Sequence, residues 1–398
     1  MGKIIKPILF IFLLVCSCLV KAELRGDVEI RLDHYPDTPL YTDQSTESTQ
    51  PGLASSVDWD GHLGDSNRVK LSLFAKYQSE SEREYSGDVQ EAWFSLDDLN
   101  SEWRIGQLME YWGVLEAENI ADVINPRDAE EDFQGDFKLG IPGIAFSYFS
   151  QQAEYSFWLL PYSRERRLAY GEDRFRNFPL ETQDPKFEKA QSNTAAAIRA
   201  SRVNDQVEFS VSYYYGHARM PWFELQLDNS NQPTGLTPMY DLINQTSFEM
   251  LWLPGNTIFK LESFYQSNKV DDFFAAGIGF EREIPKLGPG NTSLTFYGEA
   301  YFDDRNQNLS QALAIFQKDI FIGTRLALND VSSSEFQFRW TYDLEYESSL
   351  IDIRAERRIG KNWFLNAVLY KFFHVESDPA LKSFQNDDRL RMSLIWNF

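Results

Sequence analysis

The sequence predicts an all-β fold: a transmembrane antiparallel up-and-down β-barrel of about 18 strands, with 16 as the fallback. Three observations predict it. The chain opens with a secretory signal, the remainder alternates apolar and polar residues in short segments, and all the long connections fall on one side of the predicted barrel. We also expect one long loop to fold toward the lumen.

Residues 1–22 have the pattern of a cleaved signal peptide. Two lysines precede an apolar run over residues 7–20, and small residues follow at the expected cleavage position. The run is short for a membrane helix, which needs about 20 residues, although an uncleaved anchor is an alternative. Lipidation of Cys18 is another alternative, which we rank below plain cleavage. The mature chain, residues 23–398, is then expected to be a single outer-membrane β-barrel domain.

The composition excludes several classes of partner and site. Both cysteines, Cys16 and Cys18, lie in the signal, so the mature chain cannot form disulfides or thiolate metal sites. The formal net charge of −22 argues against nucleic acid as a partner, because a phosphate backbone attracts basic proteins. The aromatic content of 15% suits the aromatic girdles of a barrel.

Alternation with a period of two residues is the main evidence for strands. In residues 335–345 the aromatic side chains share one face and the charged ones share the other. The last segment, residues 389–398, alternates in a similar way and ends in Trp396 and Phe398. We expect these two residues to form the C-terminal signal that the barrel-assembly machinery recognises.

The connections provide an independent test, because barrels of this kind have short periplasmic turns and longer extracellular loops. When the C-terminus is placed in the periplasm, the longest connections, residues 111–140, 163–192, 217–244 and 303–319, all fall outside. Closed bacterial barrels have an even number of strands. The weakly alternating residues 53–59 supply the strand that makes the count even.

The segment over residues 104–140 is the most informative part of the chain. It combines many acidic residues with apolar residues that a freely solvated loop does not need. We expect it to fold into the barrel, narrow the lumen and set the local field; a lid over the mouth is an equal alternative. The candidate constriction residues are Trp112, Gly113, Glu116, Glu118, Asp122, Asn125, Asp128, Glu130, Glu131 and Asp132.

Arginines on the faces opposite the apolar ones are predicted to line the lumen. The candidate basic wall consists of Arg199, Arg325, Arg339, Arg354, Arg389 and Arg391. An acidic loop opposite this wall would produce a transverse field that orients polar solutes. The alternative is arginine–carboxylate pairing that merely fills the lumen.

A further group of arginines within residues 164–176 is expected in an extracellular loop. Arginine binds phosphate in a bidentate manner, so contact with lipopolysaccharide phosphates is one interpretation. Pairing with neighbouring acidic residues is the interpretation that we favour.

The same long segment carries a family resemblance. The pattern R-x-G-x-x-x-x-x-W-G-V, then D-x-I-N-x-x-D, then K-L-G-x-P resembles a poorly characterised group of porin-like outer-membrane β-barrels of proteobacteria. It is more distantly similar to alginate-export-type barrels. The matching residues are Arg104, Gly106, Trp112, Gly113, Val114, Asp122, Ile124, Asn125, Asp128, Lys138, Leu139, Gly140 and Pro142, with residues 160–166 further on. The resemblance implies a barrel in the outer membrane of a Gram-negative bacterium and a role in transport.

No catalytic set is recognisable, and we expect neither enzymatic activity, nor a metal site, nor a cofactor. The four histidines are scattered, without metal-ligand spacing. The leading function is a porin-like outer-membrane channel for passive passage of small polar solutes. The alternative is a non-conducting barrel that acts as an export or assembly component for a lipid or polymer. The expected partners are outer-membrane lipid and lipopolysaccharide, and a homo-oligomer or a periplasmic partner is a further option.

Overall fold

The computed structural model describes residues 21–64, 66–134, 137–287, 291–306, 314 and 316–398. The expected signal peptide lies outside the described residues except for Lys21 and Ala22, and so does Cys18. Within the described ranges, no helix has the length and apolar character needed to cross a membrane.

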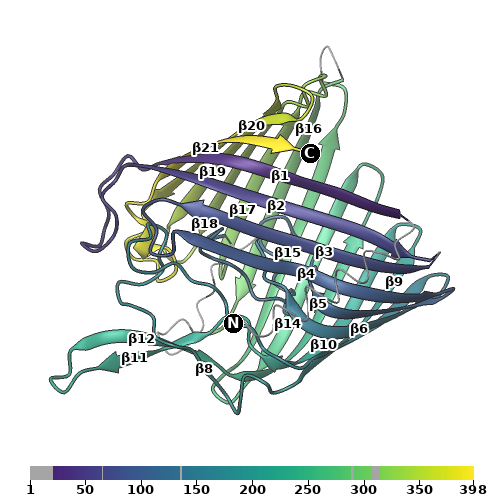
Figure 1. Cartoon of the computed structure of the whole chain (residues 1–398), viewed down its shortest axis with the longest axis horizontal. Coiled ribbons are helices and arrows are strands. Elements are labelled where there is room, and N and C mark those ends of the chain that lie inside the picture. The colour runs from purple at the N-terminus through teal and green to yellow at the C-terminus, as the bar shows by residue number, and fades with distance from the viewer. Residues whose placement is uncertain (1–20, 65, 135–136, 288–290, 307–313, 315) are drawn as a thin grey trace.

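Eighteen strands form one antiparallel sheet that closes on itself. The seam joins β1 to β21, from Asp27 opposite Asn397 to His34 opposite Leu390, and Figure 1 shows the two terminal strands side by side. The predicted fold class and strand number are therefore confirmed. The strands are β1 (Lys21–His34), β2 (Thr49–Leu63), β3 (Asn67–Gln78), β4 (Tyr85–Asp98), β5 (Ser101–Leu108), β6 (Ile141–Phe149), β7 (Ala153–Leu160), β9 (Ala195–Asn204), β10 (Val207–His217), β13 (Leu242–Trp252), β14 (Thr257–Ser267), β15 (Asp272–Ile284), β16 (Ser293–Asp303), β17 (Asp319–Ala327), β18 (Glu335–Asp343), β19 (Ser349–Arg358), β20 (Trp363–Phe373) and β21 (Arg389–Asn397).

Three further strands lie in the extracellular loops and form a small separate sheet. They are β8 (Lys186–Phe187), β11 (Trp222–Leu227) and β12 (Pro233–Tyr240), and one short 3-10 helix, η1 (Lys382–Phe384), lies between β20 and β21. Figure 1 shows the hairpin of β11 and β12 projecting from the barrel. The weakly alternating residues 53–59 lie within β2, as the even strand count requires.

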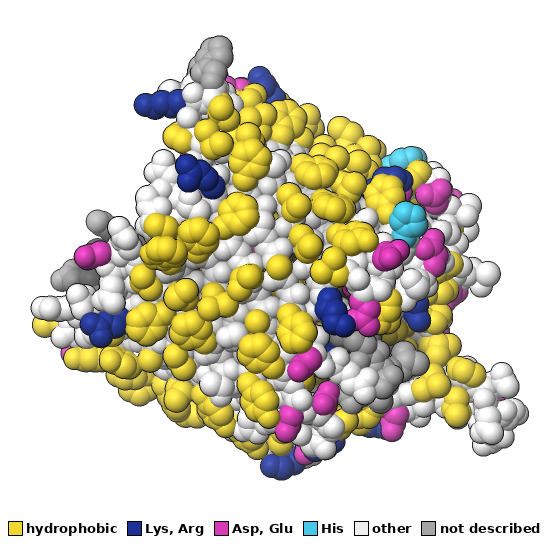
Figure 2. All heavy atoms as spheres, turned by 180° about the vertical axis from the view of Figure 1, so that it is seen from behind, with side chains coloured by type: hydrophobic (Ala, Val, Ile, Leu, Met, Phe, Trp, Pro, Cys, Tyr) yellow, Lys and Arg dark blue, Asp and Glu magenta, His cyan; other side chains and the backbone are white. Residues whose placement is uncertain are grey.

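Alternating side chains give the barrel an apolar outside and a polar inside, because successive residues of a strand point to opposite faces. In β16, Tyr297 and Glu299 are buried in the lumen, whereas Phe296 and Phe302 are exposed on the outside. Figure 2 shows hydrophobic side chains spread over the outer wall. An exposed apolar band of this kind is the surface that a barrel presents to lipid.

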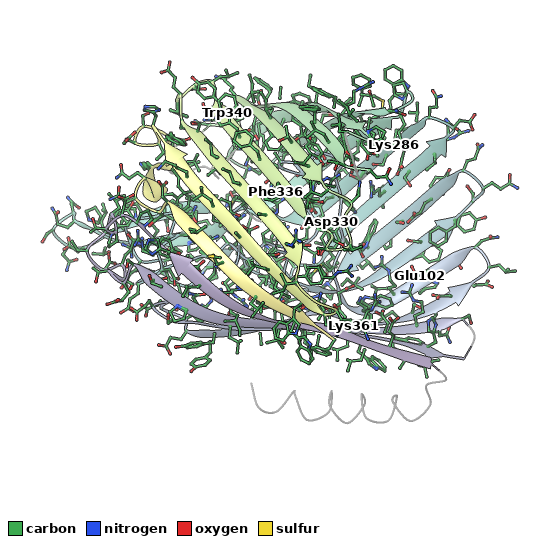
Figure 3. The ribbon with its side chains drawn as sticks, turned by 90° about the horizontal axis from the view of Figure 1, so that it is seen from above. Glu102, Lys286, Asp330, Phe336, Trp340 and Lys361 are labelled. Atoms are coloured by element: carbon green, nitrogen blue, oxygen red, sulfur yellow. The ribbon has the colours of Figure 1, made fainter. Side chains whose placement is uncertain are left out.

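The connections sort by length as the sequence predicts. The turns that carry Lys286, Asp330 and Lys361 lie along one rim of the barrel (Figure 3). On β18, Phe336 and Trp340 lie further along the strand that follows the Asp330 turn. The longer connections all lie at the opposite end, which therefore corresponds to the extracellular side.

Candidate functional site: a loop across the lumen

The loop between β5 and β6, described over residues 109–134 and 137–140, crosses the lumen from one wall to the other. Near the start of the loop, Trp112 packs edge-on against Trp158 of β7, with ring centroids 5.4 Å apart. Near the tip, Phe133 packs against Tyr370 of β20, with ring centroids 5.0 Å apart. The loop folds inward because its apolar side chains, which the sequence singled out, bury themselves against both walls.

Glu262 of β14 is the main anchor of the loop. Its side chain is fully buried and accepts hydrogen bonds from the backbone N–H groups of Leu115 at 2.8 Å and Ala121 at 3.0 Å. The N–H of Val114 donates to the same carboxylate. A carboxylate that accepts several backbone donors forms charge-assisted hydrogen bonds, which are stronger than neutral ones. One wall residue therefore fixes two separate turns of the loop.

Two more wall glutamates extend this anchoring on either side of Glu262. Glu249 of β13 accepts a hydrogen bond from the N–H of Gly113 at 3.2 Å. Glu299 of β16 accepts hydrogen bonds from the N–H groups of Glu116 at 2.7 Å and Ala117 at 3.0 Å. The loop is thus attached to the wall through its backbone, so the attachment does not depend on the side chains at these loop positions.

Asn125 closes the base of the loop. Its side-chain nitrogen donates to the carbonyl of Leu108, the last residue of β5, at 3.0 Å and to the carbonyl of Leu139, just before β6, at 2.9 Å. Its side-chain oxygen accepts from the N–H of Glu110 at 2.8 Å. Because the groups at the two ends of the loop meet on one amide, Asn125 holds the entry and exit of the loop together.

Gly113 is needed where the loop turns away from the wall. Its φ is +106°, a backbone conformation that residues with a side chain rarely adopt. A Cβ at this position would also lie 2.5 Å from the side chain of Asn119. The Trp-Gly corner of the sequence is therefore a conformational requirement of the inward fold.

Most of the acidic candidates of the loop form ion pairs. Glu118 pairs with Arg127 at 2.6 Å, Asp122 pairs with Lys138, and Asp128 pairs with Arg167 at 2.5 Å. Glu130 lies 2.7 Å from Arg83, and Glu131 lies 2.6 Å from Arg31 of β1. Asp132 caps the next turn by accepting the N–H of Gln134 at 3.2 Å.

Glu116 is the exception among these acids. Its side chain remains 36% exposed, and its closest described cation, Lys260 of β14, lies 4.0 Å away. Of the loop carboxylates named above, it is the one that can interact most freely with a solute in the lumen.

The candidate basic wall is likewise balanced by carboxylates of the wall itself. Each of the six arginines has such a neighbour: Arg199 with Glu249 (2.6 Å), Arg325 with Glu281 (3.9 Å), Arg339 and Arg354 with Asp352 (3.4 and 2.8 Å), and Arg389 and Arg391 with Asp33 (3.8 and 2.7 Å). The sequence analysis expected an acidic loop to face a basic wall across the lumen. In the structure, most of these acidic and basic side chains instead form ion pairs with neighbouring residues.

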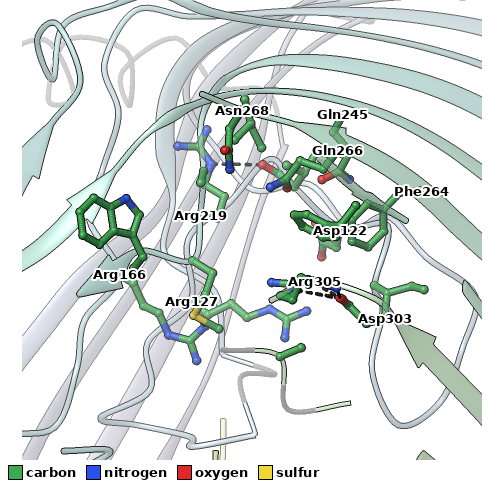
Figure 4. Close-up of a pocket in the computed structure, with 18 of the residues that line it drawn as sticks. Asp122, Arg127, Arg166, Arg219, Gln245, Phe264, Gln266, Asn268, Asp303 and Arg305 are labelled. Carbon is green, nitrogen blue, oxygen red and sulfur yellow. Dashed lines mark hydrogen bonds and ion pairs between the residues drawn. The ribbon is translucent and has the colours of Figure 1, made fainter. Parts of the chain in front are cut away.

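A charged cavity of about 160 Å³ lies on the extracellular side of the loop (Figure 4). Arg305 and Asp303 form a bidentate pair at its edge: Nε donates to Oδ1 at 2.9 Å and Nη2 donates to Oδ2 at 2.6 Å. Arg219 donates from Nε to the carbonyl of Val123 at 3.1 Å, but both of its terminal nitrogens are buried without a hydrogen-bond partner among the described residues. The Arg219 guanidinium thus places positive charge in the lining of the cavity.

Several of these residues were not identified from the sequence as functional. Glu249, Glu262 and Glu299 were recognisable as lumen residues from the strand alternation, but nothing in the sequence indicated that they bind the loop backbone. Arg219 lies in an irregular extracellular connection, where no period assigns a direction to its side chain.

His217 occupies a structural position rather than a reactive one. Its Nδ1 accepts from the Ser163 hydroxyl at 2.8 Å, and its Nε2 donates to the Glu188 carbonyl at 2.8 Å. The side chains of His217 and Ser163 are buried, and Glu188 contacts the ring only through its backbone oxygen. In the part of the chain that the structure describes, no cluster of His, Asp and Glu side chains is suited to hold a metal ion.

Solved structures with the same architecture are outer-membrane porins. The chain resembles a BenF-like porin from Pseudomonas fluorescens Pf-5, with a TM-score of 0.58 and 10% identity over 96% of this chain and 99% of that one. It also resembles OccD3 (OpdP) and OccK5 (OpdH) of Pseudomonas aeruginosa. Their TM-scores are 0.55 and 0.54, their identities are 10% and 11%, and the matches cover 96% of this chain and 92% and 98% of theirs.

No family model matches the sequence, and no curated protein matches it either. At such low identity the likeness concerns the fold. The chain is thus an 18-stranded barrel with the architecture of outer-membrane porins, and its lumen is crossed by a loop that the wall holds through buried glutamates.

Proposed function

We propose that this protein is an outer-membrane channel for the passive passage of small polar solutes, with residues 109–140 forming its constriction. The observation that carries the proposal is the polar lumen, in which the loop is fixed by Glu249, Glu262 and Glu299 beside a charged cavity. A barrel of about 18 strands encloses more space than its own side chains fill. A loop fixed in that space narrows the lumen and sets its selectivity.

The solved porins of the same fold support a transport role over an enzymatic one. The distant similarity to alginate-export-type barrels stays a prediction, as do contacts with lipopolysaccharide and self-association. Trp396 and Phe398 lie partly exposed on β21 and just beyond it, with ring centroids 5.2 Å apart. This position at the periplasmic end of the barrel supports their proposed role as an assembly signal.

Single-channel conductance of the refolded mature protein in planar bilayers tests the proposal. The companion variant is Glu116→Lys, because the Glu116 carboxylate is the freest in the loop. Glu130 and Glu131 are less suitable, because their replacement would break pairs with Arg83 and Arg31. The matched control is Glu376→Lys, which makes the same charge change on an exposed extracellular residue.

We expect discrete conductance steps in the wild type and a shift of selectivity toward anions in Glu116→Lys but not in Glu376→Lys. A folded barrel that shows no conductance at any voltage would refute the channel. It would favour the second candidate, a non-conducting export or assembly component. The packing of Trp112 and Phe133 against the walls would then explain why no ions pass.

A further inference from the structure

The outer wall of the barrel has a groove near its periplasmic rim, where β7, β9 and β10 are neighbours in the sheet. The groove has a volume of about 530 Å³ and is lined by the turn of residues 150–152 and by residues of the three strands. Tyr155 of β7 and Phe209 of β10 stand on opposite sides of β9. The lining beside them includes Ala153 and Ala200, whose small side chains leave the hollow between the two rings.

The strand register gives the depth of the groove in the membrane. On one side, Tyr155 is directly opposite Ala200 and is 54% exposed. On the other side, Phe209 is opposite Met250, and the next outward residue toward the periplasm is Trp252, which is 43% exposed. Exposed tyrosines and tryptophans form the girdle of a barrel at the membrane interface. The groove lies between these two levels, and therefore at the depth of the inner-leaflet headgroups.

Arg202 of β9 places a positive charge in this groove. It follows Ile198 by four residues, and Ile198 is exposed on the lipid-facing side, so the Arg202 side chain also points outward. Its Nη2 donates to Oε1 of Gln152 at 3.2 Å, and Gln152 lines the groove as well. The hydrogen bond shows that the guanidinium end of the side chain, and not only its stem, lies at the groove.

No acid neutralises this arginine. None of the residues that line the groove is acidic, and Arg202 forms no ion pair within the described part of the chain. A guanidinium group has five N–H donors, and the bond to Gln152 uses one of them. An unpaired cation at the edge of the hydrocarbon region is costly unless it meets an anion there.

We propose that this groove binds the phosphate group of a phospholipid of the inner leaflet. Arg202 has the paired N–H donors that bind two phosphate oxygens at once, and the amides of Gln151 and Gln152 are further donors beside it. An acyl chain of the same lipid would lie over Ala200 and against Ile198, on the exposed apolar surface.

A phospholipid fits better than a dissolved anion because the groove combines one cation with aromatic and aliphatic side chains at the interface. The site lies on the outer wall of the barrel, so it is separate from the passage of solutes through the lumen.

Native mass spectrometry of the full mature barrel in a non-ionic detergent tests the proposal by measuring lipid binding. The probes are phosphatidylglycerol, a diacylglycerol with the same chains but no phosphate, and inorganic phosphate as competitor. The variants are Arg202→Gln, which breaks no ion pair, and Ala200→Trp, which fills the groove from outside. The matched control is Arg282→Gln, which removes an arginine of β15 that donates to Thr257 and does not line the groove.

We expect one saturable site for phosphatidylglycerol in the wild type and at least tenfold weaker binding of the diacylglycerol. Arg202→Gln should bind phosphatidylglycerol about tenfold more weakly, as for the loss of one charge-assisted hydrogen bond. Ala200→Trp should bind it at least tenfold more weakly, and Arg282→Gln as the wild type does.

Wild-type binding by both groove variants, or equal weakening in Arg282→Gln, would overturn the proposal, because lipid would then bind all around the outer surface. Equal binding of the diacylglycerol would show that the phosphate group is not recognised and would overturn it as well. Displacement of the lipid by millimolar inorganic phosphate would show a site for free anions, which also contradicts it. None of these results depends on whether the barrel conducts.

Discussion

Replacement of Glu262 by alanine is expected to release the first half of the lumen loop from the wall. The carboxylate accepts three backbone N–H groups, those of Val114, Leu115 and Ala121. A hydrogen bond to a charged acceptor contributes roughly 1.5–3 kcal/mol net, and water can enter the lumen and replace part of it. We therefore expect a loss of about 3–5 kcal/mol in the free energy that holds this part of the loop.

Hydrogen–deuterium exchange of the loop amides measures this release directly. Since about 1.4 kcal/mol corresponds to a factor of ten, exchange at Leu115 and Ala121 should accelerate at least about a hundredfold in Glu262→Ala. Glu262→Gln should have a smaller effect, about tenfold, because the amide keeps one oxygen for Val114 and Leu115 but turns a donor toward Ala121.

The matched control is Glu281→Gln, a lumen glutamate of β15 that pairs with Lys260 at 3.2 Å and with Arg325 at 3.9 Å. In the Glu281→Gln variant, the amides of the lumen loop should exchange as fast as in the wild type. Unchanged exchange in Glu262→Ala, or the same acceleration in the Glu281 variant, would refute the anchoring of the loop by Glu262.

Three further variants test other parts of the site. Asn125→Ala removes the hydrogen bonds that join the two ends of the loop and should lower the free energy of unfolding by about 2–4 kcal/mol, measured by urea denaturation in detergent. Gly113→Ala should cost about 1–3 kcal/mol at φ +106° and shift Asn119; unchanged thermal stability and loop exchange would contradict this. Arg219→Gln should leave folding intact, since the side chain makes one hydrogen bond, but should reduce the permeability of anions relative to cations; equal reversal potentials would argue against its role in the cavity.

The strands could be predicted from the sequence because their environment repeats every two residues. In the segment 335–345, one face is aromatic and the other charged. The structure places residues 335–343 in β18, with Phe336 and Phe338 exposed on the outside, and residues 344–345 in the turn that follows. Residues 53–59 alternate only weakly, and here the requirement for an even strand number, rather than the local pattern, identified the strand.

The inward fold of residues 109–140 could also be expected, because Trp112 and Ile124 are apolar residues in a long acidic connection. The partners of the charged residues could not. Asp33 of β1 meets Arg391 of β21 only because the barrel closes, and Glu131 meets Arg31 only because the loop crosses the lumen. These contacts join distant parts of the chain, and no local period encodes them.

The sequence by itself determined the architecture, the two faces of each strand, the side on which the long loops lie and the loop that folds inward. Each of these follows from the local cost of placing a polar or an apolar side chain in lipid or in water, which can be evaluated along the chain. The tertiary structure alone decided how the loop is held and which charges neutralise one another. Those features depend on barrel closure and on the path of the loop across the lumen, which bring Glu262 to the loop backbone and Glu131 to Arg31.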